Sequence, residues 1–240
     1  WGGEGTLRCL DLATGDLIWR RDLNDDYGAE LGMFPVAGSV LIADGRVILN
    51  VGGIEQSAGV VALDKMTGDT LWTVSDHGPG DATAVPANIH GKDYLFILTA
   101  DGLLSLDPPT GKMHWQIPFQ AKAPDTSNAT TPAVWNDLVL ISAYKVGSLC
   151  VRVLPDGSHE ELWRKRRNLM CQYQNLIVRD GYVYGFSAND HTLRCLEMET
   201  GKVQWKWQPE HRRGQMLALG DTLVILFETG HLAAVDVSPE

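Results

Sequence analysis

The chain has 240 residues, of which 44% are hydrophobic and 21% charged, and its formal net charge is −10. This composition is typical of a globular protein, and no apolar run reaches the length that a membrane-spanning helix needs. The acidic balance argues against nonspecific binding to nucleic acid or to anionic membranes, because both require a basic surface.

One phrase recurs along the chain: Leu-Asp-x-x-Thr-Gly, followed four residues later by Trp. Clear copies span residues 10–19, 63–72 and 106–115, a copy with Glu for Asp spans 196–205, and a degenerate copy spans 154–163. A sixth phrase begins at Ala234. The five Trp residues are successively 53, 43, 48 and 42 residues apart, which is close to the length of a four-stranded propeller blade.

The phrase has the chemistry of a turn between two strands. Its Asp can accept hydrogen bonds from the backbone two residues on, and its Gly can adopt the positive φ that other residues resist. The Trp that follows is large enough to fill the gap between neighbouring blades, so we expect it in the core. The alternative interpretation is a row of stacking platforms for sugars or bases.

A second hairpin precedes each phrase. It consists of a polar turn between two apolar runs, at residues 40–49, 89–97, 134–141, 176–184 and 217–225. The two hairpins together predict four antiparallel strands per repeat, and no stretch shows a convincing helical period. The fold class is therefore an all-β propeller of four-stranded antiparallel blades.

The repeats predict one domain over residues 1–240, with about five to six blades' worth of chain. We expect a partial blade at 1–20, blades at about 31–75, 80–118, 128–166 and 172–208, and an incomplete blade at 214–240. The end repeats do not combine into a single four-stranded blade. The chain is thus expected to be an arc of a ring with six to eight blades.

Single residues carry few signals for chemistry. The four cysteines form no C-x-x-C pair, and we expect Cys9 and Cys195, which lie in twin Thr-Leu-Arg-Cys-Leu strings, to pack as small apolar groups. The histidines are not at metal-ligand spacing, so no catalytic, cofactor-binding or metal residue is assigned. The basic run at residues 164–167 is interpreted as a solvated loop, with a docking patch for an acidic partner as the alternative.

The repeated phrase with its upstream hairpin resembles the pyrroloquinoline quinone (PQQ)-like repeat. Residues 61–68 and 180–186 are very similar to those of bacterial PQQ-binding-like, or BamB-like, propeller proteins. The resemblance implies a noncatalytic binding or scaffold module for protein or small-ligand partners, located in the periplasm or at the cell surface, without membrane insertion or nucleic acid binding. No signal peptide is visible in this chain.

The alternative implied by the resemblance is a fragment of a PQQ-dependent quinoprotein dehydrogenase that oxidises alcohols or sugars. Such enzymes hold PQQ with calcium beside a disulfide of adjacent cysteines, and this sequence has no adjacent cysteines. No cofactor is therefore predicted.

Propeller geometry places a binding site at the mouth of the central channel, just before the innermost strand of each blade. The residues at these positions are Met33, Phe34, Thr83, Asn128, Thr130, Gln172, Tyr173 and Gln215. We expect them to contact a peptide or a small ligand. A second route to a protein partner is the addition of its strand to an exposed blade edge.

Overall fold

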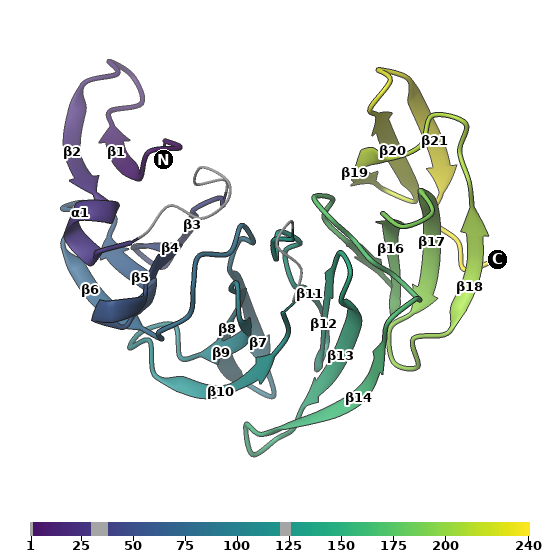
Figure 1. Cartoon of the computed structure of the whole chain (residues 1–240), viewed down its shortest axis with the longest axis horizontal. Coiled ribbons are helices and arrows are strands. Elements are labelled where there is room, and N and C mark those ends of the chain that lie inside the picture. Colours follow the sequence, from purple (N-terminus) through teal and green to yellow (C-terminus); the bar gives the residue numbers. More distant parts are fainter. Residues whose placement is uncertain (1, 30–37, 121–125) are drawn as a thin grey trace. The chain divides into compact units, whose positions relative to one another are not determined.

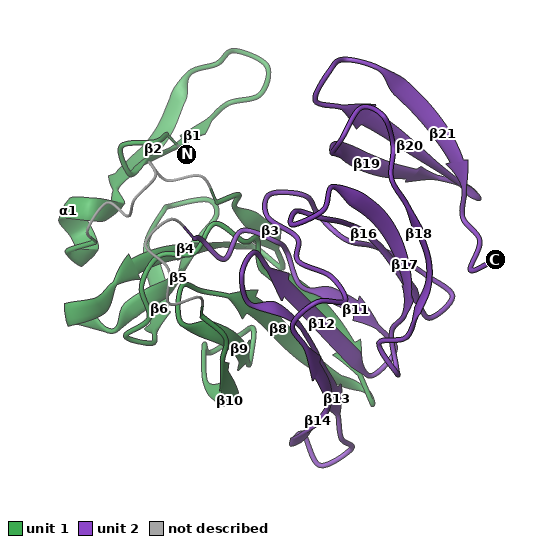
Figure 2. Ribbon diagram, turned by 45° about the vertical axis from the view of Figure 1, so that its right-hand side comes forward, with its two compact units in different colours: residues 1–120 green, residues 121–240 purple. Residues whose placement is uncertain are grey.

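The computed structural model describes residues 2–29, 38–120 and 126–240, and most of its elements are labelled in Figure 1. The contacts divide the chain into two compact units, Trp1–Gln120 and Ala121–Glu240 (Figure 2). Nearly all regular elements are strands joined by tight turns. The predicted all-β class is confirmed.

The first unit contains a hairpin followed by two four-stranded antiparallel sheets. The hairpin is β1–β2, and the sheets have the strand orders β3-β4-β5-β6 and β10-β9-β8-β7. Strand bounds are β1 Thr6–Leu10, β2 Leu17–Asp22, β3 Leu41–Ala43, β4 Arg46–Gly53, β5 Ala58–Asp64, β6 Thr70–Val74, β7 Val85–Ile89, β8 Lys92–Leu98, β9 Gly102–Leu106 and β10 Met113–Pro118. A 3₁₀ turn, η1, spans Ile54–Gln56.

The second unit contains two four-stranded sheets and one three-stranded sheet. Their orders are β11-β12-β13-β14, β15-β16-β17-β18 and β19-β20-β21. Strand bounds are β11 Ala133–Trp135, β12 Leu138–Ala143, β13 Gly147–Val153, β14 His159–Lys165, β15 Ile177–Arg179, β16 Tyr182–Ser187, β17 Thr192–Glu197, β18 Val203–Trp207, β19 Gly214–Leu219, β20 Thr222–Phe227 and β21 Leu232–Asp236.

One short helix, α1 (Leu23–Tyr27), corrects the expectation of no helix. Asp22 caps its first turn by accepting the Asp25 backbone N–H, and Gly28 ends it in the left-handed conformation. The side chains of Leu23 and Tyr27 are buried against β4 and β5 residues. A helix of five residues is too short to produce an apolar period, so the sequence pattern did not reveal it.

The repeated phrase forms the predicted turn. In the copy between β5 and β6, the Asp64 carboxylate accepts backbone N–H groups from Met66 and Thr67 at 2.8 and 3.0 Å. These hydrogen bonds lower the pKa of the Asp64 carboxyl below its ordinary value. Gly68 closes the turn at a φ of +77° and donates its N–H to the Asp64 carbonyl.

Four of the five phrase Trp residues are anchored by a hydrogen bond to the sheet that follows along the chain. The indole Nε1 donates to a backbone carbonyl there, with pairs Trp19–Lys65, Trp72–Pro108, Trp163–Met198 and Trp205–Ser238 at 2.8–3.1 Å. Where that next turn has its Gly, the ring lies so close that a Cβ would stand within 2.6–2.9 Å of it, at Gly68, Gly111 and Gly201. The Trp is therefore a packing residue between neighbouring sheets, as predicted.

A small residue lies opposite the Trp of each of the five phrases on the neighbouring strand. The pairs are Cys9–Trp19, Ala62–Trp72, Ser105–Trp115, Cys150–Trp163 and Cys195–Trp205. Three of the four cysteines thus occupy one equivalent position, and all four are free thiols. Burial raises the pKa of the Cys150 thiol to about 12 and that of Cys195 to about 11, so both thiols are protonated and unreactive at neutral pH.

Candidate functional site

The predicted channel-mouth residues are divided between the two units. Met33 and Phe34 lie outside the described residues. Thr83 belongs to the first unit, where it is half-buried between β6 and β7. The other five belong to the second unit and are considered together below.

In the first unit, Thr83 lies on the connection between β6 and β7, which is hydrogen-bonded to the β8–β9 turn near its start. The His77 Nδ1 atom and the Thr99 hydroxyl are 2.7 Å apart, and the Gly78 N–H donates to the Asp101 carboxylate at 2.7 Å. Ala82 on one side of Thr83 is buried. The first part of this connection is therefore held to residues 99–101, between β8 and β9.

In the second unit, Asn128 and Thr130 are buried, with 4% and 0% exposure, and they lie on the connection before β11. The next residue, Thr131, donates its backbone N–H to the Asn175 side chain at 3.3 Å. This hydrogen bond joins the connection before β11 to the connection before β15. The structure thus brings together two of the predicted segments.

Gln172 is linked to a third segment by an arginine that sequence reasoning missed. Its Oε1 accepts from Arg213 Nη1 at 2.7 Å, and Arg213 Nη2 pairs with Glu228 at 3.1 Å. Tyr173 beside this bridge is 51% exposed, whereas Gln215 lies within β19 with its side chain exposed. Arg213 lies directly before β19. The rule that selects residues just before the innermost strand of each blade therefore applies to Arg213 as well, and this position was the signal that could have found it.

Two histidines lie close in the sequence to the ion pair of Arg213 and Glu228. The rings of His211 and His231 are stacked, with centroids 3.8 Å apart and an interplanar angle of 4°. Phe227 contacts His211 at 5.5 Å and Trp207 at 6.3 Å, and Trp207 is 38% exposed. We call the surface made by Gln172, Tyr173, His211, Arg213, Glu228 and His231 the mouth surface of the second unit.

The mouth surface combines an arginine held by two partners with an exposed tyrosine and two stacked imidazoles. The Arg213 guanidinium is engaged on both sides by Gln172 and Glu228, so it holds three segments in place. The exposed Tyr173 ring and the stacked imidazoles offer flat, amphipathic contact area, which is characteristic of protein and peptide contacts. No nucleophile with an adjacent base is formed by these residues.

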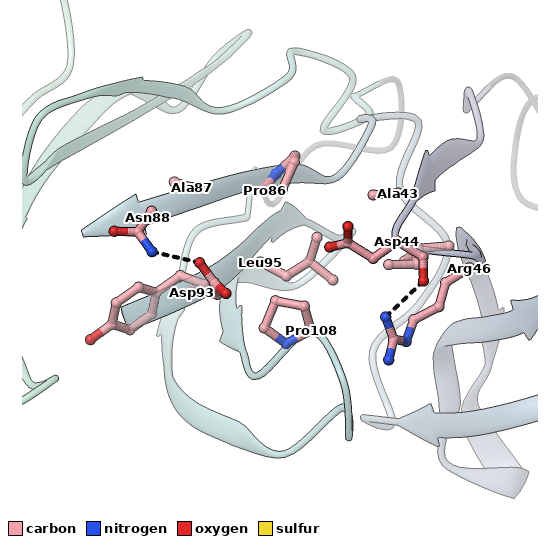
Figure 3. Close-up of a pocket in the computed structure, with 11 residues that line it drawn as sticks. Ala43, Asp44, Arg46, Pro86, Ala87, Asn88, Asp93, Leu95 and Pro108 are labelled. Carbon is pink, nitrogen blue, oxygen red and sulfur yellow. Dashed lines mark hydrogen bonds between the residues drawn. The ribbon is translucent and has the colours of Figure 1, made fainter. Parts of the chain in front are cut away.

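A pocket of about 400 Å³ lies in the first unit, between the β3–β4 and β7–β8 hairpins (Figure 3). Its lining combines the polar side chains of Asp44, Arg46 and Asp93 with apolar residues such as Leu95 and Pro108. Arg46 Nη1 donates to the Asp44 carbonyl at 3.1 Å, and the Asn88 amide donates to Asp93 at 2.6 Å. The Arg46 Nε atom is buried without a hydrogen-bond partner among the described residues, so the polar groups of the pocket are only partly satisfied by one another.

The described residues do not fit a PQQ and calcium site. Among them, no group of three or more His, Cys, Asp or Glu side chains is arranged to hold a metal ion. The four cysteines are free, and none is adjacent to another in the sequence.

In the part of the chain that the structure describes, no helix has the length and apolar character to cross a membrane.

Comparisons with known proteins agree with this architecture. The sequence profile of the family described as outer membrane protein assembly factor BamB matches residues 1–207. A relative with that name from Moranella endobia is 24% identical over 246 residues, which cover 97% of this chain and 58% of the relative. The chain spans about half the length of the curated relatives it matches.

Solved structures show the same fold at low sequence identity. BamB from Moraxella catarrhalis has a TM-score of 0.72 and 20% identity, covering 97% of this chain and 65% of its own. A quinohemoprotein alcohol dehydrogenase from Comamonas testosteroni has a TM-score of 0.59 and 15% identity, covering 84% of this chain and 41% of its own. The predicted propeller of PQQ-like blades is confirmed, and the chain belongs to the family of the outer membrane protein assembly factor BamB.

Proposed function

We propose that this protein is a noncatalytic propeller module that binds protein partners outside the cytoplasm during outer membrane protein assembly. The observation that carries the proposal is the family match over residues 1–207. The names of its relatives indicate the process, and the mouth surface has side chains suited to protein contacts. The dehydrogenase alternative has no comparable support, because its structural neighbours are less similar.

Within this function, we assign partner contact to the mouth surface of the second unit. Its exposed Tyr173 lies beside a bridge that fixes Gln172, Arg213 and Glu228 relative to one another. Such preorganisation lowers the entropy cost of binding, because the contact residues are already held in place. Met33, Phe34, Thr83, Asn128, Thr130 and Gln215 remain further candidates for partner contact.

Photo-crosslinking in the parent bacterium tests this assignment. A photoreactive amino acid replaces Tyr173 in one strain and Met66 in the control strain. Met66 is 65% exposed and lies in the β5–β6 turn of the first unit. We expect a discrete protein adduct at position 173 that weakens when Gln172→Ala is added, and none at position 66. Equal adducts at both positions, or none at position 173, would refute the proposed surface.

A further inference from the structure

The basic run of residues 164–167 separates into two pairs with different surroundings. Arg164 Nη2 pairs with Glu161 at 3.0 Å. Lys165 donates to the Thr200 carbonyl at 2.6 Å, and its ammonium lies 5.6 Å from the centroid of the Trp163 ring. Both residues belong to β14, so the fold itself uses their charges.

The second pair of the basic run consists of Arg166 and Arg167. They begin the turn at residues 166–168 that follows β14, and both are exposed. Among residues 2–29, 38–120 and 126–240, neither guanidinium forms an ion pair. Two adjacent exposed arginines therefore have no counter-charge among the residues that the structure describes.

The backbone of this turn is held rigidly by a buried arginine. Arg194 is 1% exposed, and its Nη1 donates to the carbonyls of Arg167 and Asn168, both at 2.6 Å. Its other nitrogens engage Asp190 and Thr192. On the other side of the turn, the Asn168 amide donates to the Gly201 carbonyl.

Close packing at Gly147 fixes the start of the turn. Gly147 has a φ of +107°, and a Cβ there would stand 2.5 Å from the Arg166 Cα atom. The turn is thus preorganised, so binding to its arginines does not require ordering of the backbone. A flexible loop of the same sequence would lack this advantage.

The charge of the rest of the protein indicates which partner fits. Residues 1–120 contain 7 Lys and Arg against 16 Asp and Glu, and residues 121–240 contain 13 against 14. A bilayer or nucleic acid is an extended anion, and it would meet the acidic surface as well as the turn. A short acidic peptide can approach the two arginines alone, because repulsion fades beyond about 8–10 Å at physiological ionic strength.

We propose that the turn at residues 166–168 binds an acidic segment of a protein partner. Asp or Glu side chains of that segment accept charge-assisted hydrogen bonds from Arg166 and Arg167, the geometry in which guanidinium binds carboxylate best. This inference rests on the proposed protein-binding function and specifies the chemistry of the partner. The turn leads along the same connection to Gln172 and Tyr173, so one partner can contact both.

The test uses the full chain and a fluorescein-labelled hexaglutamate peptide, with binding followed by fluorescence anisotropy at low and physiological salt. We expect R166Q/R167Q to weaken binding roughly ten-fold or more, since both charge pairs are lost. The matched control R164Q removes a charge that already pairs with Glu161, so binding is expected to stay within about two-fold of the wild type. Thermal unfolding checks that all variants are folded.

Three results would overturn the proposal: no peptide binding by the wild type, equal weakening by R164Q, or stronger binding to phosphatidylglycerol vesicles that R166Q/R167Q abolishes. The vesicle result would identify a lipid as the ligand. The crosslink at position 173 reports on the proposed function independently of this peptide. Failure of the peptide assay with an intact crosslink therefore rejects the acidic ligand and leaves the binding module in place.

Discussion

The tryptophan of the repeated phrase has two contacts that act together. Its ring packs over the turn of the next sheet, and its indole N–H satisfies a backbone carbonyl there. The equivalent small residue on the neighbouring strand, Ala62 or Cys150 for example, makes room for the ring. Repetition in the sequence indicated a packing role for the Trp, whereas the hydrogen bond to a turn about 36 residues away had no local signal.

Trp72→Ala is expected to destabilise the protein by about 3–5 kcal/mol, because a ring that is only 8% exposed leaves a cavity between two sheets. Trp72→Phe keeps part of the packing and loses the hydrogen bond to Pro108, so a smaller cost of about 1–2 kcal/mol is expected. Urea denaturation measures both. Trp207→Ala is the control, because this ring is 38% exposed and does not belong to the repeated phrase. An equal loss of unfolding free energy in the control would contradict the proposed packing role of the phrase Trp.

The buried Arg194 predicts a pH dependence through Asp190. Burial acts to raise the pKa of Asp190, but hydrogen bonds from Thr192 and the charge of Arg194 hold it below its ordinary value. A lowered folded-state pKa stabilises the protein fully above the unfolded-state pKa of about 3.9, and the stabilisation disappears as pH falls through the folded-state pKa. We therefore expect Asp190→Asn to be destabilising at pH 7 and to approach the wild type below about pH 4.

Urea denaturation at several pH values checks this convergence. Asp221→Asn is the matched control, because Asp221 also pairs with an arginine, Arg179, but its side chain is 95% exposed. A small, nearly constant difference from the wild type is expected for the control. A difference for Asp190→Asn that stays unchanged down to pH 3 would contradict the argument.

At the scale of elements, the two turns of one sheet allow the backbone and packing contributions to be separated. Gly91 in the β7–β8 turn and Gly111 in the β9–β10 turn have φ values of +76° and +71°. A Cβ on Gly91 would meet no atom within 4 Å, whereas one on Gly111 would lie 2.6 Å from the Trp72 ring. Both sites require the left-handed conformation, but only Gly111 is in contact with another sheet.

Gly91→Ala is expected to cost about 1–2 kcal/mol, the penalty of an L-residue in the left-handed region. Gly111→Ala is expected to cost this amount and, in addition, about 1–3 kcal/mol for displacement of Trp72 from its site. Denaturation curves of the two variants give the difference directly. Equal costs would show that the contact between the Trp ring and the turn contributes no stability.

The elements that the sequence predicted well are those with local chemistry. Asp or Asn with Gly marks a hairpin turn by its own φ values and hydrogen bonds, so hairpins such as those at Asp44 and Asp64 were evident. Helix α1 was missed because five residues carry no period. The equivalence of Cys150 to Cys195 was hidden by the longer β13–β14 hairpin, because Cys150 lies 13 residues before its Trp and Cys195 lies 10 residues before its own.

At the scale of the whole molecule, the family and fold followed from the repeat, but the candidate surface did not. The mouth surface joins Gln172, Arg213 and Glu228, which come from three different segments. The preceding-strand rule selected Gln172 and Tyr173, yet nothing in the sequence near Arg213 indicates that its partners are so far along the chain. The role of Arg194 in fixing a basic turn likewise depends on tertiary contacts.

A cofactor titration separates the binding module from the dehydrogenase alternative for the whole molecule. The protein contains eight Trp residues, so bound PQQ would be detected by quenching of their fluorescence together with the quinone absorbance. We expect no saturable, calcium-dependent quenching up to high micromolar PQQ. The reason is the set of available ligands. The sequence has no adjacent cysteines, and among the described residues no three His, Cys, Asp or Glu side chains are grouped so that they could hold a metal ion.

Calcium alone and PQQ with a chelator are the controls in this titration, because free quinone absorbs light and mimics weak, linear quenching. Saturation that appears only when both ligands are present would contradict the binding-module proposal and direct attention to alcohol and sugar substrates. Linear quenching that is the same with and without calcium is the expected result. In that case the PQQ-like repeat serves this protein as an architecture of hairpins and Trp contacts, and recognition depends on the connections between its blades.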